Sequence, residues 1–230
     1  DTNAAELSSA GSEIDFLSNG FKLRTAGDGT VNNNNLIYAA FADYPFERAT
    51  TNQGYTIASS TRFNGTNQYL NRTVPAFGKG TYSAWFKRGS IGVNAGLWGS
   101  DGNGGYIYFN SDKLYITLRA AGLAYITTPV YRDPSSWHHL VVSCDPTVVG
   151  ETIYIDGVQV TAFDQSGNAS GCALSAGSTD YVGTIYSAST KYSGYMADIN
   201  VVDGQALTPT SFGQFDSNGN WGPKSYSGAY

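Results

Sequence analysis

Two neighbouring segments with alternating side chains, residues 137–144 and 151–155, constrain the fold of this 230-residue chain more than any other feature. A short turn-rich stretch separates them, and the second segment runs directly into Asp156-Gly157. Alternation with a period of two, bounded by turn residues, is typical of a half-buried antiparallel hairpin. Asp-Gly is a strong signal for a tight turn between strands. The sequence therefore predicts a β-hairpin over residues 137–157.

The composition extends this expectation to the whole chain. Only 13% of the residues are charged, against about 25% in ordinary soluble domains. Their place is taken by 28 glycines, 17 tyrosines and many Asn, Ser and Thr residues, which suit strands and turns. Long helical patterns are absent, so we expect an all-β protein.

Charge and hydropathy exclude two classes of partner. The net charge is −5 and the isoelectric point is about 4.8, without a cluster of Lys and Arg that could neutralise phosphates, so nucleic-acid binding is not expected. No run of about 18 apolar residues is present, so no membrane span is expected. The chain begins with Asp1-Thr2-Asn3 rather than with methionine, and we expect a processed product or a piece of a longer polypeptide.

Further short strands follow one another at the spacing of a two-sheet sandwich. They are predicted at residues 61–70, 82–88, 95–98, 105–110, 113–119, 124–128, 180–185 and 192–202. In the segment 82–88, either Tyr82 and its alternate neighbours or Trp85 and its alternate neighbours face inward. Thr208 and Pro209 have the types of a helix cap and a first helical residue, which predicts one short helix near residues 209–214.

The two cysteines and two histidines leave few metal options. Cys144 and Cys172 either form a disulfide, which would close a loop of about 28 residues, or remain as unpaired thiols. Two cysteines are too few for a zinc site. His138 and His139 are adjacent, so in a strand they face opposite sides of the sheet, and one of them is expected to reach solvent.

Six segments in their order resemble laminin-G-like (concanavalin A-like) jelly-roll domains. They are residues 63–70, 82–88, 97–100, 137–143, 153–157 and 192–204. The resemblance covers roughly residues 55–215 and implies a two-sheet antiparallel jelly roll over residues 49–216. Residues 217–230 are then a polar C-terminal tail in which Trp221 is an anchor.

Both ends of the chain resemble segments of phage virion proteins. Residues 14–46, with Asn19-Gly20 and an apolar stretch at 36–46, resemble the end of SPRY-like sandwich repeats. A lone hairpin is marginal in water, so residues 1–48 are expected to be the last strands of an upstream domain or an N-terminal extension. Residues 203–224 resemble phage-encoded members of the jelly-roll family. These resemblances imply a tail-fibre or other virion surface component that forms homo-oligomers and contacts other virion proteins.

Catalysis is not expected from the acidic residues. Concanavalin A-like glycosidases carry a Glu-x-Asp-x-Glu pattern on one strand, and here Glu13 and Asp15 are followed by Leu17. An essential carboxylate is therefore missing. A depolymerase whose carboxylates come from different strands is the alternative, and a purely structural spacer domain is another.

The resemblance also implies a calcium ion at one rim of the sandwich, held by oxygen ligands. The candidates are Asp101, Asn103 and Asp112, with Asp180 or Asp145 reaching across. The alternative is that these Asp and Asn residues only form turns.

Binding of a host cell-surface glycan is the function with the most physical content. Sugars stack their C–H faces on aromatic rings, and polar neighbours bind their hydroxyl groups. The candidate ligand residues are Trp98, Asp101, Asn103, Tyr106, Tyr125, Tyr131, Tyr186 and Tyr192. Trp85 and Trp137 are assigned to packing. Aromatic residues also fill sandwich cores, which is the alternative for each of these residues.

Overall fold

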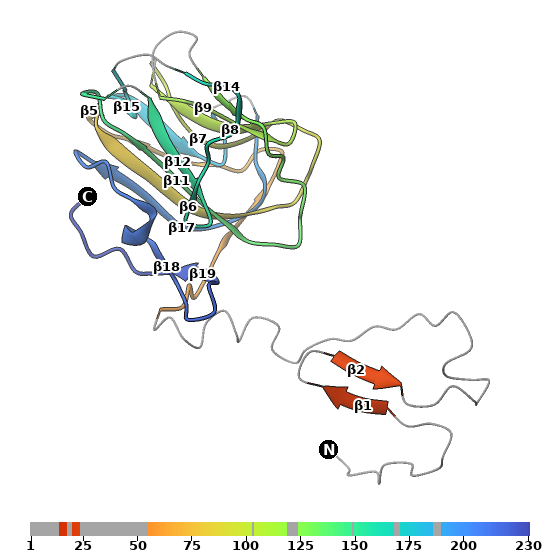
Figure 1. Ribbon diagram of the computed structural model, residues 1–230. Coiled ribbons are helices and arrows are strands. Elements are labelled where there is room, and N and C mark those ends of the chain that lie inside the picture. Colours follow the sequence, from red (N-terminus) through yellow and green to blue (C-terminus); the bar gives the residue numbers. More distant parts are fainter. Residues whose placement is uncertain are drawn as a thin grey trace. The chain divides into compact units, whose positions relative to one another are not determined.

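The structure is a computed structural model, shown in Figure 1. It describes residues 14–17, 20–23, 55–102, 104–118, 124–148, 150–167, 171–185 and 190–230. The chain divides into two units, residues 1–45 and 46–230, and each is described by itself.

The first unit contains one antiparallel hairpin. Its strands are β1 (Ile14–Leu17) and β2 (Gly20–Leu23), with Ile14 opposite Leu23 and Leu17 opposite Gly20. The predicted apolar segment 36–46 lies outside the described residues.

The second unit is a sandwich of two antiparallel sheets. One sheet has six strands in the order β13 (Val158–Gln159), β12 (Glu151–Ile155), β11 (His138–Cys144), β6 (Gly80–Arg88), β17 (Ser193–Asp203) and β3 (Thr61–Asn64). The other has seven strands in the order β14 (Phe163–Gln165), β10 (Tyr125–Thr127), β9 (Lys113–Thr117), β8 (Tyr106–Asn110), β7 (Ala95–Ser100), β16 (Thr179–Val182) and β4 (Leu70–Thr73). Two small pairs, β5 (Ala76–Phe77) with β15 (Ser175–Ala176) and β18 (Gly213–Phe215) with β19 (Trp221–Pro223), complete it. The predicted all-β sandwich is confirmed.

Alternation along β6 decides which side chains form the core. Tyr82, Ala84 and Phe86 lie between the two sheets and are at most 1% exposed. Ser83 and Trp85 lie on the other face of the strand, which we call the outer face of the six-stranded sheet. Of the two phases that the sequence left open, the structure has the first.

The predicted hairpin forms from β11 and β12, with Leu140 opposite Ile155. Asp156 and Gly157 turn the chain from β12 into β13, and both have positive φ, 51° and 78°. That combination is the one that a two-residue type I′ turn requires. The Asp156 carboxylate also accepts the backbone N–H of His139 at 2.7 Å, which ties the turn to β11.

The C-terminal residues cover the outer face of the six-stranded sheet. Phe212 packs there with Val141 and Val202, and Leu207 and Tyr226 pack against them. The predicted helix over 209–214 is too long. Only Pro209–Ser211 forms one turn of 3₁₀ helix, the Thr208 hydroxyl makes no capping bond to it, and the following residues pair as β18.

A disulfide joins Cys144, the last residue of β11, to Cys172. Their Cα atoms are 6.2 Å apart, within the usual range for a bridge. Of the two alternatives that the sequence left open, the structure has the bridge, and it fastens the end of the six-stranded sheet to the segment that precedes β15.

No helix among the described residues has the length and apolar character needed to cross a membrane.

Candidate functional site

Three tyrosines form an aromatic surface on the outer face of the seven-stranded sheet. Tyr106 and Tyr108 are two residues apart on β8, so their side chains point to the same side of the sheet. Tyr115 on β9 lies directly opposite Tyr108. The ring centroid of Tyr115 is 4.8 Å from that of Tyr108 and 6.1 Å from that of Tyr106. We call these three residues the tyrosine patch.

The tyrosine patch is half-buried rather than freely solvated. Burial raises the pKa of the Tyr115 hydroxyl above its usual value, and the charge and hydrogen bond of Tyr106 add to the rise. The Tyr115 hydroxyl therefore stays neutral at physiological pH and can both donate and accept hydrogen bonds. Inward-facing neighbours on the same strands, such as Ile107 and Phe109, are fully buried and hold the backbone of the patch in place.

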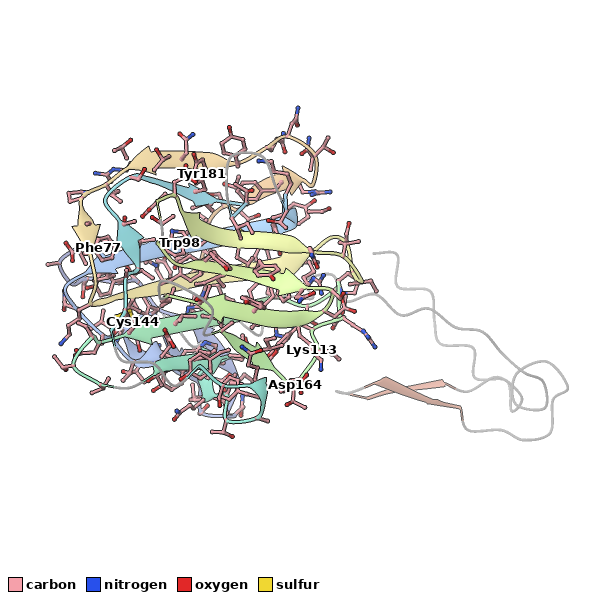
Figure 2. The ribbon with its side chains drawn as sticks, turned by 90° about the horizontal axis from the view of Figure 1, so that it is seen from above. Phe77, Trp98, Lys113, Cys144, Asp164 and Tyr181 are labelled. Atoms are coloured by element: carbon pink, nitrogen blue, oxygen red, sulfur yellow. A yellow bond between two sulfur atoms is a disulfide. The ribbon has the colours of Figure 1, made fainter. Side chains whose placement is uncertain are left out.

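One side of this face carries an ion pair between Lys113 of β9 and Asp164 of β14. Thr128 donates its hydroxyl to the other oxygen of Asp164 at 2.9 Å. Figure 2 shows Lys113 and Asp164 together, with Tyr181 well away from them across the sheet. The side chains of Lys113 and Asp164 are 35% and 41% exposed, so this is a polar, solvent-accessible border.

The other side of the face carries Asp101 and two further tyrosines. The Tyr181 hydroxyl donates to the Asp101 carboxylate at 2.8 Å. Tyr69 packs on Tyr181 with ring centroids 5.7 Å apart, and the Lys191 ammonium lies 4.0 Å from the Tyr69 ring centroid. Such a contact between a cation and an aromatic face is favourable.

Gly99 on β7 lets the backbone at Ile185 pass close over the sheet beside the tyrosine patch. Gly99 lies between Tyr181 on β16 and Tyr106 on β8 in the strand register. A Cβ atom on Gly99 would be 2.1 Å from the carbonyl oxygen of Ile185. Only a residue without a side chain permits this approach, so the Ile185 backbone borders the patch.

The structure places the eight predicted ligand residues in different surroundings. Tyr106 belongs to the tyrosine patch. Asp101 is bonded to Tyr181, which is separated from Tyr106 by Gly99 in the strand register. Tyr131 is half-buried and packs edge-on against Phe109. Asn103 and Tyr186 lie outside the described residues.

Three of those predictions are wrong because the side chains are buried. Trp98 and Tyr192 are 0% exposed in the core between the sheets, and Tyr125 is 6% exposed. Tyr125 faces inward on β10 and packs against Phe163. A ring without exposed surface cannot stack on a sugar.

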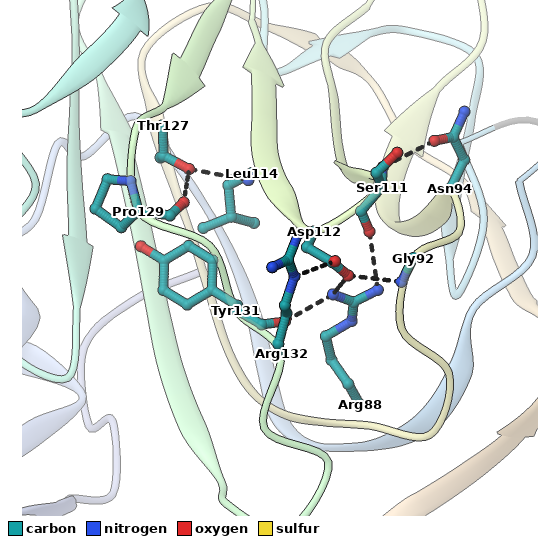
Figure 3. A network of polar contacts seen from close by, with 10 residues as sticks. All are labelled: Arg88, Gly92, Asn94, Ser111, Asp112, Leu114, Thr127, Pro129, Tyr131 and Arg132. Atoms are coloured by element: carbon teal, nitrogen blue, oxygen red, sulfur yellow. Dashed lines mark hydrogen bonds and ion pairs between the residues drawn. The ribbon is translucent and has the colours of Figure 1, made fainter.

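The predicted calcium ligand Asp112 serves a different purpose. Its carboxylate accepts hydrogen bonds from Arg88 at 2.8 Å, from Arg132 at 2.7 Å and from the backbone N–H of Gly92 at 2.7 Å (Figure 3). Arg88 also donates to the carbonyl oxygens of Ser111 and Tyr131. The Gly92 N–H and the two guanidinium groups lower the pKa of Asp112 to about 2, against the opposing effect of burial. With its oxygens engaged in this way, Asp112 does not fit a calcium site, and that prediction is corrected.

The calcium candidates Asp180 and Asp101 have hydrogen-bond partners of their own. Asp180 is 8% exposed and accepts a hydrogen bond from Ser175 at 3.1 Å, whereas Asp101 is bonded to Tyr181 on the outer face. Burial raises the pKa of Asp180, which favours its protonated form. Across the described part of the chain, no three His, Cys, Asp or Glu side chains are grouped as metal ligands would be.

A groove of about 560 Å³ opens between the two sheets at one edge of the sandwich. The strands β4 and β16 form one wall and the second half of β17 forms the other. We call it the edge groove. Asp180 and Asp203 line it from opposite sheets, and Trp98 lies at its base without exposed surface.

Sequence reasoning missed Tyr108 and Tyr115. The sequence contained part of the signal. Tyr106 and Tyr108 are two residues apart in the predicted strand 105–110 and so share a face, and Tyr115 lies in the predicted strand 113–119. What the sequence could not show is that β8 and β9 pair so that Tyr108 lies opposite Tyr115.

The fold matches solved structures of low sequence identity. A heptameric SAP-like pentraxin from Limulus polyphemus aligns with a TM-score of 0.50 and 19% identity, over 65% of this chain and 77% of the other. A candidate carbohydrate-binding protein from Bacteroides ovatus aligns with a TM-score of 0.50 and 18% identity, over 67% of this chain and 46% of the other. The mouse laminin alpha1 chain aligns with a TM-score of 0.46 and 17% identity, over 76% of this chain and 48% of the other.

Among curated protein sequences, none matches this chain. Residues 50–211 match the Laminin_G_3 family, which is described as the concanavalin A-like lectin/glucanases superfamily. The match spans most of the chain and both sheets of the sandwich, so this protein belongs to the concanavalin A-like lectin/glucanase superfamily.

Proposed function

We propose that this domain binds carbohydrate through the tyrosine patch and does not act on it as an enzyme. The carrying observation is the grouping of Tyr106, Tyr108 and Tyr115 on the outer face of an ordered sheet. Tyrosine offers a flat apolar ring for the C–H face of a sugar and a hydroxyl that bonds to a sugar hydroxyl. Rigid strands hold the rings in place before a ligand arrives, which reduces the entropy that binding costs.

Two further features support this proposal. The lectins and glucanases that give the superfamily its description both handle carbohydrate. The borders of the face also supply charged and hydroxyl groups, namely the Lys113–Asp164 pair with Thr128 on one side and Asp101, which the buried Tyr181 holds in place, on the other. A few polar groups around an apolar centre are the usual composition of a small-molecule site.

A glycan array with the full chain tests the proposal. We expect retention on a subset of glycans, and loss of at least about tenfold in affinity in Tyr108→Ala and Tyr115→Ala, because each substitution removes a stacking ring. Val158→Ala is the control, since Val158 is 63% exposed on β13 of the six-stranded sheet and lies outside the tyrosine patch. Parallel arrays with calcium and with a chelator test whether retention depends on calcium. A folded protein that retains no glycan in either condition contradicts the proposal.

One observation favours a second candidate, the cleavage of a glycan chain. Asp180 is a buried carboxylic acid with a raised pKa in the edge groove, and Asp203 lines the same groove from the other sheet. A raised pKa is what a general acid needs, and glycoside hydrolysis uses two carboxyl groups. Release of reducing ends from polysaccharides, lost in Asp180→Asn, would establish this activity in place of simple binding.

We further propose that the protein is a surface or tail-fibre component of a phage virion and forms homo-oligomers. The support comes from the sequence, in which residues 14–46 and 203–224 resemble phage-encoded segments. Fibres are symmetric, so copies of one chain associate through repeated contacts. Mass spectrometry of purified particles should find the chain among the virion proteins, and sedimentation of the isolated chain should show an oligomer. A monomer that is absent from particles contradicts this part of the proposal.

A further inference from the structure

A further groove, lined by aromatic residues, lies on the outer face of the six-stranded sheet. It measures about 560 Å³ and is bordered by Trp85 of β6, Trp137 before β11 and Trp221 of β19. We call it the tryptophan groove. Trp85 and Trp137 were assigned to packing on the sequence alone. The structure shows that Trp85 packs against His139, with ring centroids 4.8 Å apart, and that both tryptophans also border this groove.

The walls of the tryptophan groove combine aromatic rings with hydroxyl groups. Besides the three tryptophans, five serine or threonine residues line it, among them Ser59 and Ser136. None of the described lining residues carries a charge. This composition suits a ligand with apolar faces, many hydroxyl groups and no charge, which is the chemistry of a neutral saccharide.

One wall of the tryptophan groove contains a buried donor without a partner. Trp85 is 8% exposed, and its Nε1–H makes no hydrogen bond to any described residue. A buried indole N–H usually finds an acceptor, because leaving it unpaired costs free energy. The neighbouring His139 cannot accept it, since Nε2 of His139 lies 2.9 Å from Ser83 Oγ and Nδ1 accepts from Trp221. A ligand oxygen in the groove is an available acceptor.

The side chain of Trp221 is closely packed and hydrogen-bonded. A Cβ atom on Gly157 or on Gly213 would approach the Trp221 ring to 2.4 or 2.3 Å, so the indole fits closely against two glycines. Its Nε1–H is fixed on His139 at 3.1 Å. The C-terminal strand β19 therefore completes a rigid wall rather than a loose flap.

We infer that the tryptophan groove binds a neutral saccharide, with the indole rings of Trp137 and Trp221 stacking on the sugar and Trp85 Nε1–H donating to one of its oxygens. The site lies on the face of the sandwich opposite to the tyrosine patch, and its residues come from different strands. It goes beyond the proposed function, because it adds a second site that does not depend on the tyrosine patch.

The test is a titration of the full chain with neutral oligosaccharides of glucose, mannose and galactose, followed by tryptophan fluorescence. We expect a saturable change in emission, with affinity about tenfold weaker in Trp137→Ala, which removes one ring. Trp85→Phe keeps a ring but loses the N–H, so we expect affinity weaker by about threefold to tenfold for loss of one hydrogen bond. Unchanged near-ultraviolet circular dichroism shows that a variant has kept its fold.

The tyrosine-patch variant Tyr108→Ala separates this inference from the proposed function. Binding that persists in Tyr108→Ala and is lost in Trp137→Ala supports the tryptophan groove. Binding that is lost in Tyr108→Ala but unchanged in Trp137→Ala and Trp85→Phe overturns the inference and leaves the proposed function standing. The inference is also overturned if none of the neutral oligosaccharides gives a saturable change in emission. The proposed function of the tyrosine patch is then tested separately, by retention of the protein on glycan arrays.

Discussion

The indole Nε1–H of Trp221 donates to Nδ1 of His139 at 3.1 Å, and this contact fixes the protonation of the histidine. Because Nδ1 accepts a hydrogen bond, the proton of the neutral ring is on Nε2, where it can be donated to Ser83 Oγ at 2.9 Å. A second proton would have to occupy Nδ1 and face the indole N–H, donor against donor. His139 is 1% exposed, and burial lowers its pKa to about 4.

The first prediction is that His139 makes the protein less stable in mild acid. The pKa of His139 is lower in the folded chain than the value of about 6.5 expected when unfolded, so acid favours unfolding. The contribution is complete above about pH 6.5 and is lost as the pH falls toward 4, with a total of about 3 kcal/mol. Urea unfolding between about pH 7.5 and pH 4.5 measures it.

His138 provides a contrast on the same strand. Its Nδ1 lies 2.7 Å from the Asp156 carboxylate, and this hydrogen bond raises its pKa. The contribution of His138 to stability is therefore complete below its pKa in the unfolded chain and is lost as the pH rises through its pKa in the folded chain. The acid loss should thus shrink in His139→Gln and remain in His138→Gln. An equal loss in wild type and His139→Gln contradicts the prediction.

The second prediction concerns the buried pair of Arg88 and Asp112, whose side chains are 1% and 6% exposed. Asp112→Asn leaves the Arg88 guanidinium buried without its counter-charge, and we expect it to lower the free energy of unfolding by about 3 kcal/mol. The pKa of Asp112 is about 2, so the stabilisation is complete above about pH 3.8 and is lost as the pH falls toward 2. Chemical unfolding at neutral pH measures the cost. Asp164→Asn, in the exposed pair with Lys113, is the control and should change stability little.

The sandwich was predictable because the alternation of apolar and polar side chains marks its strands in the sequence. The predicted segment 82–88 became β6 (Gly80–Arg88), and its inward residues form the centre of the core. The C-terminal segment was harder to predict. A threonine and a proline at 208 and 209 have the right types for a helix start, yet pairing of β18 with β19 ended the helix after one turn. Local signals do not reveal such pairing.

The candidate site was only partly predictable, and Trp98 shows why. Simple alternation along β7 would point Trp98 outward together with Gly96. A bulge between Gly96 and Trp98 shifts the register against β8 and turns the indole into the core. A one-residue shift moves a side chain to the other face, and the sequence carries no distinct sign of it.

The third prediction concerns the disulfide between Cys144 and Cys172, which are separated by 28 positions. Closing a loop of this length restricts the unfolded chain, and reduction should lower the free energy of unfolding by about 3–4 kcal/mol. Urea unfolding with and without a thiol reductant measures the difference. The double variant Cys144→Ser/Cys172→Ser should unfold at a lower urea concentration that the reductant does not alter. A wild-type midpoint that is insensitive to complete reduction contradicts the prediction.

The fourth prediction connects stability with the tyrosine patch. In Gly99→Ala the new methyl group would lie 2.1 Å from the Ile185 carbonyl oxygen, so the chain at Ile185 must move away from the sheet. Overpacking of this kind should cost about 1–3 kcal/mol. Because Gly99 lies between Tyr181 and Tyr106 in the register, the displacement also changes the border of the tyrosine patch.

We therefore expect Gly99→Ala to lower the thermal midpoint and to weaken glycan retention together. Tyr108→Ala should weaken retention with a smaller effect on stability, since its half-buried ring leaves no closed cavity behind. Thermal unfolding and the glycan array, run on both variants, separate the two effects. If Gly99→Ala loses stability but retains glycans like the wild type, the border formed by Ile185 does not contribute to binding, and the tyrosine rings alone form the site.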